Sequence, residues 1–108
     1  MTTSNFDNPE DEKLAVLARA TLRRTGAQQA GALRDTTGRT YVGTNIASHT
    51  FIRDAAESVL TIALTSQING IESAVFVGNG ALNIVPLRDF APTCAISALQ
   101  ENGEIVPL

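Results

Sequence analysis

Three side chains of this sequence have chemistry that catalysis or metal binding can use: Glu57, Cys94 and His49. A carboxylate such as Glu57 can take up and return protons at a reacting centre. Cys94 is the single cysteine, so its thiol can be a nucleophile or a ligand but cannot form a disulfide within the chain. His49 is the single histidine. Because a protein metal site gathers about three or four such ligands, these residues alone predict no metal site.

Each of these residues also has a purely structural interpretation. Glu57 lies four residues after Arg53 and can pair with it across one helical turn, or it can line a functional pocket. Cys94 can be a small buried residue at the start of a helix, or a reactive thiol. His49 fits a loop or capping role, and Asn45 either holds a ligand or serves a strand end and its turn. The residue types leave these alternatives open.

Composition narrows the class of protein. The chain has 108 residues, the size of one small domain, and 44% of them are hydrophobic. A net charge of -3 argues against nucleic-acid binding, which needs clustered Lys and Arg. No apolar run approaches the roughly 18 residues of a membrane span. Residues 1–12 are polar and acidic, unlike a signal peptide, so we expect a cytoplasmic protein with no nucleic-acid or membrane partner.

The first half of the chain predicts a helix followed by two strands. Residues 1–8 suit a short disordered tail, after which Asn8 can cap a helix that has Pro9 in its first turn and ends at Gly26. Residues 27–34 form a weak strand pattern and residues 39–45 a better one. Between them, residues 35–38 read Asp-Thr-Thr-Gly, a hairpin turn with glycine where positive φ is needed.

The next segment predicts a second helix, from about Thr50 or Phe51 to Gln67. Apolar residues recur at helical spacing, and further apolar side chains widen the hydrophobic surface beyond one stripe. A helix that is apolar on most sides is buried on most sides. The segment therefore predicts a helix that is buried in a core or in a subunit contact.

The remaining residues predict a buried strand and further short elements. Residues 71–78 contain an uninterrupted apolar run typical of a central strand. The other expected elements are a turn at 79–80, a strand at 82–85, a loop at 86–92, a short helix from Thr93 to Asn102-Gly103, and an edge strand at 105–108. Together these elements predict one α/β domain over residues 9–108, with a mixed β-sheet flanked by helices.

Two stretches of this sequence together resemble one known family. Residues 38–46 read Gly-Arg-Thr-Tyr-Val-Gly-Thr-Asn-Ile, and residues 55–57 read Ala-Ala-Glu at the head of an apolar helix. This is similar to the cytidine deaminase family, in which a hairpin ending in Gly-x-Asn-Val-Glu precedes a helix that starts with Cys-Ala-Glu. The resemblance covers roughly residues 13–105. It implies a three-layer α-β-α fold and a small homotetrameric type of protein.

The resemblance also implies a site, which this chain matches only in part. In the family, three cysteines, or one histidine and two cysteines, hold a zinc ion that ionises water, and a glutamate shuttles protons. The first ligand position falls on Ala55, the glutamate on Glu57, and a ribose-binding asparagine on Asn45. The family places Pro-Cys-x-x-Cys at the start of the next helix, and only Cys94 is available there. At most one of three ligands remains, so we expect no zinc and no other cofactor.

Two functions are consistent with this partial match. The first is a cytidine deaminase-like protein that has lost the catalytic zinc site and works through binding or assembly. The second is a divergent nucleoside deaminase that uses Glu57. In either case the resemblance implies a homo-oligomer, a tetramer or a dimer, and permits a small nucleoside-like ligand in a pocket containing Asn45, Ala55, Glu57 and Cys94.

Overall fold

A computed structural model describes residues 6–108 and shows three helices and seven strands within them. In chain order these are α1 Pro9–Thr25, β1 Gln29–Asp35, β2 Thr40–Thr44, β3 Ile46–Ala47, β4 Ile52–Arg53, α2 Ala55–Thr65, β5 Ile71–Gly78, α3 Val85–Phe90, β6 Ala95–Leu99 and β7 Ile105–Pro107. Residues 1–5 of the expected disordered tail lie outside the described residues. Of its remaining residues, Phe6 is half-buried against the core beneath α1, and Asn8 caps that helix.

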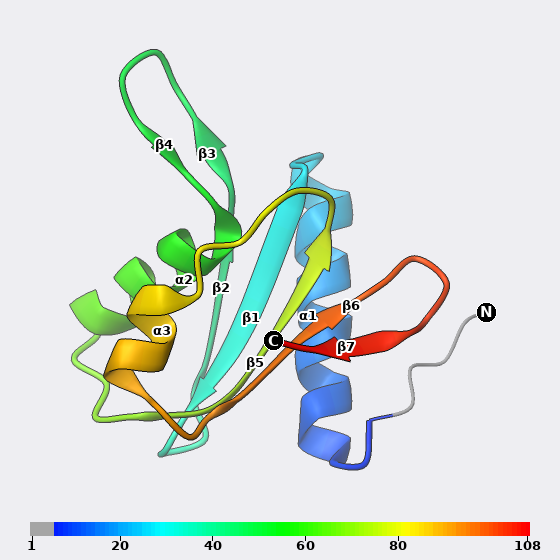
Figure 1. The fold of residues 1–108 in the computed structure, drawn as a ribbon, viewed down its shortest axis with the longest axis vertical. Coiled ribbons are helices and arrows are strands. Elements are labelled where there is room, and N and C mark those ends of the chain that lie inside the picture. The colour runs from blue at the N-terminus through cyan, green and yellow to red at the C-terminus, as the bar shows by residue number, and fades with distance from the viewer. Residues whose placement is uncertain (1–5) are drawn as a thin grey trace.

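Five strands form one mixed sheet in the order β2-β1-β5-β6-β7. All neighbouring pairs are antiparallel except β5 and β6, which run parallel because α3 carries the chain back between them. Helix α1 covers one face, while α2 and α3 cover the other (Figure 1). This confirms the predicted three-layer α-β-α fold.

The ends of the first helix and the first hairpin agree with the sequence signals. The Asn8 side chain accepts a hydrogen bond from the Glu10 amide at 2.9 Å, and Gly26 closes α1 in the left-handed conformation, with φ of 68°. Gly38 in the first hairpin turn has φ of 90°. No helix within residues 6–108 is both long enough and apolar enough to cross a membrane. The cytoplasmic location stays a prediction.

Strand β1, expected to be weak, is an interior strand that pairs antiparallel with β2 and β5, and all seven of its residues are buried. Its small residues look like poor strand formers, but they allow close packing in the middle of the sheet. A Cβ at Gly31 would collide with the ring of Phe76, the largest fully buried side chain. Packing against neighbouring strands and helices makes this segment a buried interior strand, and a local sequence pattern does not contain that packing.

Helix α2 begins at Ala55, several residues after the predicted start at Thr50 or Phe51. The intervening residues form a hairpin, in which β3 pairs with β4 through Ile46 with Arg53 and Ala47 with Ile52. The start is fixed by Asp54, whose side chain caps the helix in reciprocal hydrogen bonds with Glu57. Asp-x-x-Glu at 54–57 was the sequence signal for this boundary.

The elements predicted between residues 82 and 102 are wrong. Residues 85–90 form α3, where a strand end and a loop were expected, and Pro86 lies in its first turn, where a proline is tolerated. Residues 95–99 form β6, where a helix was expected. The local sequence contains good helix formers, but parallel pairing with β5 and antiparallel pairing with β7 override that preference.

Candidate functional site

The N-terminus of α2 and the segment that leads into α3 meet through Asp54, Glu57 and Asn83. The Asp54 carboxylate accepts from the Glu57 amide at 2.9 Å and from the Asn83 amide at 2.7 Å. The Glu57 carboxylate accepts from the Asp54 amide at 3.0 Å, and its second oxygen accepts from the Asn83 side chain at 3.3 Å. Both oxygens of Glu57 therefore have partners in the protein.

These contacts set the charge state of Glu57. The hydrogen bond from the Asp54 backbone lowers the pKa of this carboxyl below its ordinary value of 4.5; the Asn83 side chain and the Arg53 charge add to that, and burial opposes it. The described residues contain no ion pair between Arg53 and Glu57. Instead the Arg53 guanidinium lies over the Phe51 ring, 4.6 Å from its centroid. Glu57 is thus an ionised capping residue.

Gln29, a residue that the sequence reasoning missed, occupies the junction between these elements. Its side chain is buried on β1, accepts from the Ala55 amide at 3.0 Å, and donates to the Ala81 carbonyl at 2.9 Å. A Cβ at Gly80 would lie 2.9 Å from the Gln29 amide nitrogen, so this loop passes close to the same side chain. A glutamine directly before the run of small and apolar residues at 30–33 was the signal that could have identified it.

Asn45 lies at the end of β2 and joins it to the start of β1. Its side-chain oxygen accepts from the backbone amides of Gln28 at 3.0 Å and Gln29 at 2.8 Å. The oxygen is therefore used by the protein's own backbone. Of the two alternatives for this residue, the strand-end role is the one for which the structure gives contacts.

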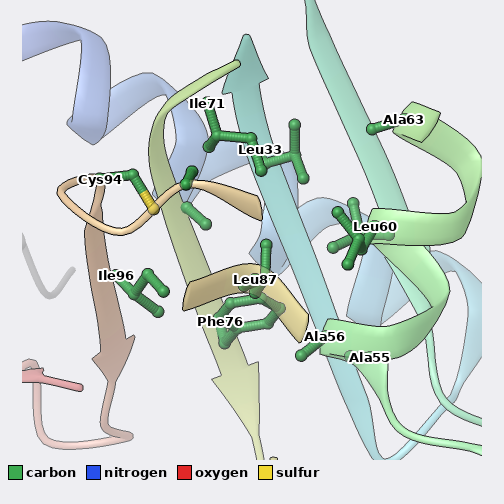
Figure 2. Packing of buried hydrophobic residues seen from close by; sticks show 13 residues of the cluster. Leu33, Ala55, Ala56, Leu60, Ala63, Ile71, Phe76, Leu87, Cys94 and Ile96 are labelled. Atoms are coloured by element: carbon green, nitrogen blue, oxygen red, sulfur yellow. The ribbon is translucent and has the colours of Figure 1, made fainter. Parts of the chain in front are cut away.

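Cys94 and His49 lie elsewhere. Cys94 follows α3 and precedes β6, so it does not start a helix as expected. It is buried near Ile71 and Ile96, well separated from Ala55 in Figure 2, and burial raises the pKa of its thiol. His49 is exposed between β3 and β4. The four predicted pocket residues therefore do not come together: Ala55 and Glu57 share one helix start, Asn45 borders it through Gln29, and Cys94 is remote.

The residues at the start of α2 supply few ligands for a metal cation. Ala55 is fully buried and contributes only a methyl group, while Gln29 and Asn83 contribute amides. Within residues 6–108, no cluster of three or more His, Cys, Asp or Glu side chains could hold a metal ion. The two carboxylates at this helix start, those of Asp54 and Glu57, already accept hydrogen bonds from the protein through both of their oxygens. The arrangement caps α2 and joins it to the segment before α3.

Comparison with known proteins shows which family this chain belongs to and which solved structure has a similar fold. The sequence profile described as cytidine deaminase-like matches residues 7–103. A crystal structure of cytidine deaminase from Burkholderia pseudomallei is similar to this structure, with a TM-score of 0.72 over 89% of this chain and 89% of that chain. The two sequences are 17% identical, so this likeness shows the fold alone. No protein with a curated description matches the sequence significantly.

Proposed function

Because the chain belongs to the cytidine deaminase-like family, we propose that it is a non-catalytic member that has lost the zinc site and works through assembly. A fold alone does not decide function, so the proposal depends on the residues at the site. The observation that carries it is the Gln29 side chain, which bonds to the Ala55 amide and the Ala81 carbonyl where two helix starts converge.

The ligand positions explain why zinc does not fit. The resemblance places the first ligand at Ala55 and two cysteines, three residues apart, at the start of the next helix. The next helix in this structure is α3, and we infer that the two cysteine positions correspond to Gly80 and Asn83, which precede it and have this spacing. Asn83 contacts Glu57 at the start of α2, and Gly80 lies close to the Gln29 side chain. Zinc prefers thiolate and imidazole. A methyl group, a hydrogen and an amide at these positions do not supply that donor set.

The state of Glu57 supports the same conclusion. A proton shuttle works best when its pKa lies near the working pH and when its oxygens can reach the substrate. The Glu57 carboxylate has a lowered pKa, and its two oxygens accept from the Asp54 amide and the Asn83 side chain. These features suit helix capping, and they count against a divergent deaminase that uses Glu57.

Assembly is the favoured alternative to catalysis because apolar side chains are exposed where a partner can cover them. The β3–β4 hairpin projects from the body of the molecule in Figure 1, and its residues Phe51 and Ile52 are 47% and 68% exposed. A two-stranded hairpin is marginally stable alone. Ile62 and Leu64 on α2 are each 43% exposed. Burial of these side chains between copies of the chain gives a homo-oligomer, a dimer or a tetramer.

An activity assay separates the two functions. Purified protein is incubated with cytidine, deoxycytidine and adenosine, and deaminated products are measured against the Glu57→Gln variant as a matched control. We expect no turnover by either protein. Turnover by the wild type that the Glu57→Gln change abolishes would establish the divergent deaminase and overturn the proposal.

A further inference from the structure

A second site of interest lies at the carboxyl ends of the two parallel strands. Strands β5 and β6 run side by side and end at Gly78 and Leu99 (Figure 1). A cavity of about 440 Å³ lies at these strand ends and is also lined by Arg19 and Leu22 of α1. Crevices beyond the carboxyl ends of strands are where α/β proteins bind small molecules, and this volume lies in the range of small-molecule sites. The cavity is not lined by Ala55, Glu57 or Asn83, so it is separate from the start of α2.

The wall of this cavity is fixed by backbone contacts. The Asn79 amide donates to the Gln28 carbonyl at 2.9 Å, and the Gln28 amide donates to the Asn45 side chain at 3.0 Å. Gly78 has φ of 101°, and a Cβ there would collide with the Gln28 carbonyl, so only glycine allows this close approach. A site held in this way needs little rearrangement to bind a ligand.

The cavity is lined by an arginine that has no partner among residues 6–108. Three arginines of the described residues are half-buried or buried: Arg19, Arg34 and Arg88. Arg34 pairs with two carboxylates, and Arg88 donates to backbone carbonyls. The Arg19 guanidinium, which lines the cavity, makes no hydrogen bond or ion pair within residues 6–108. A guanidinium without a partner on such a half-buried arginine is suited to a ligand carboxylate, which it can bind through two parallel hydrogen bonds.

The opposite charge is also present at the cavity. Glu101 lines the cavity. Leu22 and Ala27 also line it and flank the C-terminal end of α1, which is the negative end of the helix dipole. The other lining residues include the polar Gln28, Asn79 and Gln100 and the apolar Leu22, Val77 and Leu99. We infer that this cavity binds a small zwitterion of the amino-acid type, with its carboxylate on Arg19 and its ammonium group toward Glu101.

Titration with defined probes tests this site. The 15N-labelled protein is titrated with L-glutamine and L-leucine, and with propionate and propylamine, which each carry one of the two charges. We expect the amide signals of Gln28, Asn79 and Glu101 to move with the amino acids, and at least about tenfold weaker binding of the singly charged probes. Arg19→Gln should weaken amino-acid binding by about tenfold or more, because the charge-assisted pair is lost.

Two variants decide the outcome. Arg23→Gln removes an exposed charge from the same helix outside the cavity, and we expect it to leave binding unchanged. Glu101→Gln should weaken binding of the amino acids but not of propionate. The absence of saturable shifts, equal binding of propionate and amino acids, or equal binding by wild type and a folded Arg19→Gln variant would each overturn the inference. None of these results bears on zinc or on deamination.

Discussion

At the scale of single residues, Glu57 is the most informative side chain. A capping role requires an ionised carboxylate that is hydrogen-bonded to the protein, whereas a proton shuttle requires a pKa near the working pH and oxygens that reach the substrate. We predict that Glu57→Ala lowers the free energy of unfolding by about 1 kcal/mol at neutral pH, the usual value of a helix cap. Glu57→Gln should lose less, since an amide oxygen can still accept from the Asp54 backbone. Urea unfolding followed by circular dichroism measures both.

The pH dependence of that loss has a defined sign. The pKa of Glu57 is lowered on folding, so its ionised form contributes stability above its ordinary pKa of 4.5 and loses it as the pH falls through the lowered value. The difference between wild type and Glu57→Ala should therefore be largest near neutrality and shrink in acid. Glu104→Ala, at an exposed carboxylate, is the control and should show little difference at either pH. A difference that grows in acid would contradict the capping role.

Part of this site was readable from the residues alone. The Asp-x-x-Glu spacing at 54–57 is a local signal, and the identity of Ala55 excludes a ligand whatever the fold. The contacts of Glu57 with Asn83, and those of Gln29 with Ala55 and Ala81, join residues more than 20 positions apart. No local pattern contains such contacts, so the sequence reasoning missed both amides.

At the scale of elements, Gln29 links the start of α2 and the loop before α3 to the interior strand β1. We predict that Gln29→Ala lowers the free energy of unfolding by roughly 2 kcal/mol, because the buried Ala55 amide loses its acceptor. Gln29→Glu keeps the acceptor but not the donor to Ala81, and should fall between Gln29→Ala and wild type. Gln28→Ala, at an exposed side chain, is the matched control. Equal stability of Gln29→Ala and wild type would show that the link is unimportant.

The errors in the predicted elements have one physical origin. Local signals correctly predicted α1, the first hairpin and β5, because caps, turn glycines and a long apolar run lie within those segments. Residues 95–99 contain helix formers, yet they form a strand because β5 and β7 offer hydrogen bonds on both sides. The helix expected over residues 93–103 is also the reason that Cys94 was considered for the family's cysteine positions. The next helix after α2 in the structure is α3, which ends before Cys94.

At the scale of the whole molecule, substitutions in the projecting β3–β4 hairpin test whether copies of the chain assemble through it. We predict that the wild type is a dimer or tetramer at micromolar concentration and that Ile52→Glu dissociates it, since a buried charge at a subunit contact is costly. Val16→Glu places the same charge on α1, where Val16 is 62% exposed, and should leave the assembly intact. Light scattering measures the mass. A monomeric wild type, or equal dissociation by both variants, would contradict assembly through the hairpin.

The central claim is that this member of the family holds no catalytic zinc, and the metal content of the purified protein tests it most directly. The wild type and Cys94→Ser are produced in zinc-supplemented medium, dialysed against zinc-free buffer, and analysed by mass spectrometry for zinc per chain. The start of α2 presents the Ala55 methyl group, two amides, and two carboxylates that already accept hydrogen bonds from the protein, so we predict no stoichiometric zinc in either protein. One tightly bound zinc per wild-type chain would contradict the account, and its loss in Cys94→Ser would identify the thiol as a ligand.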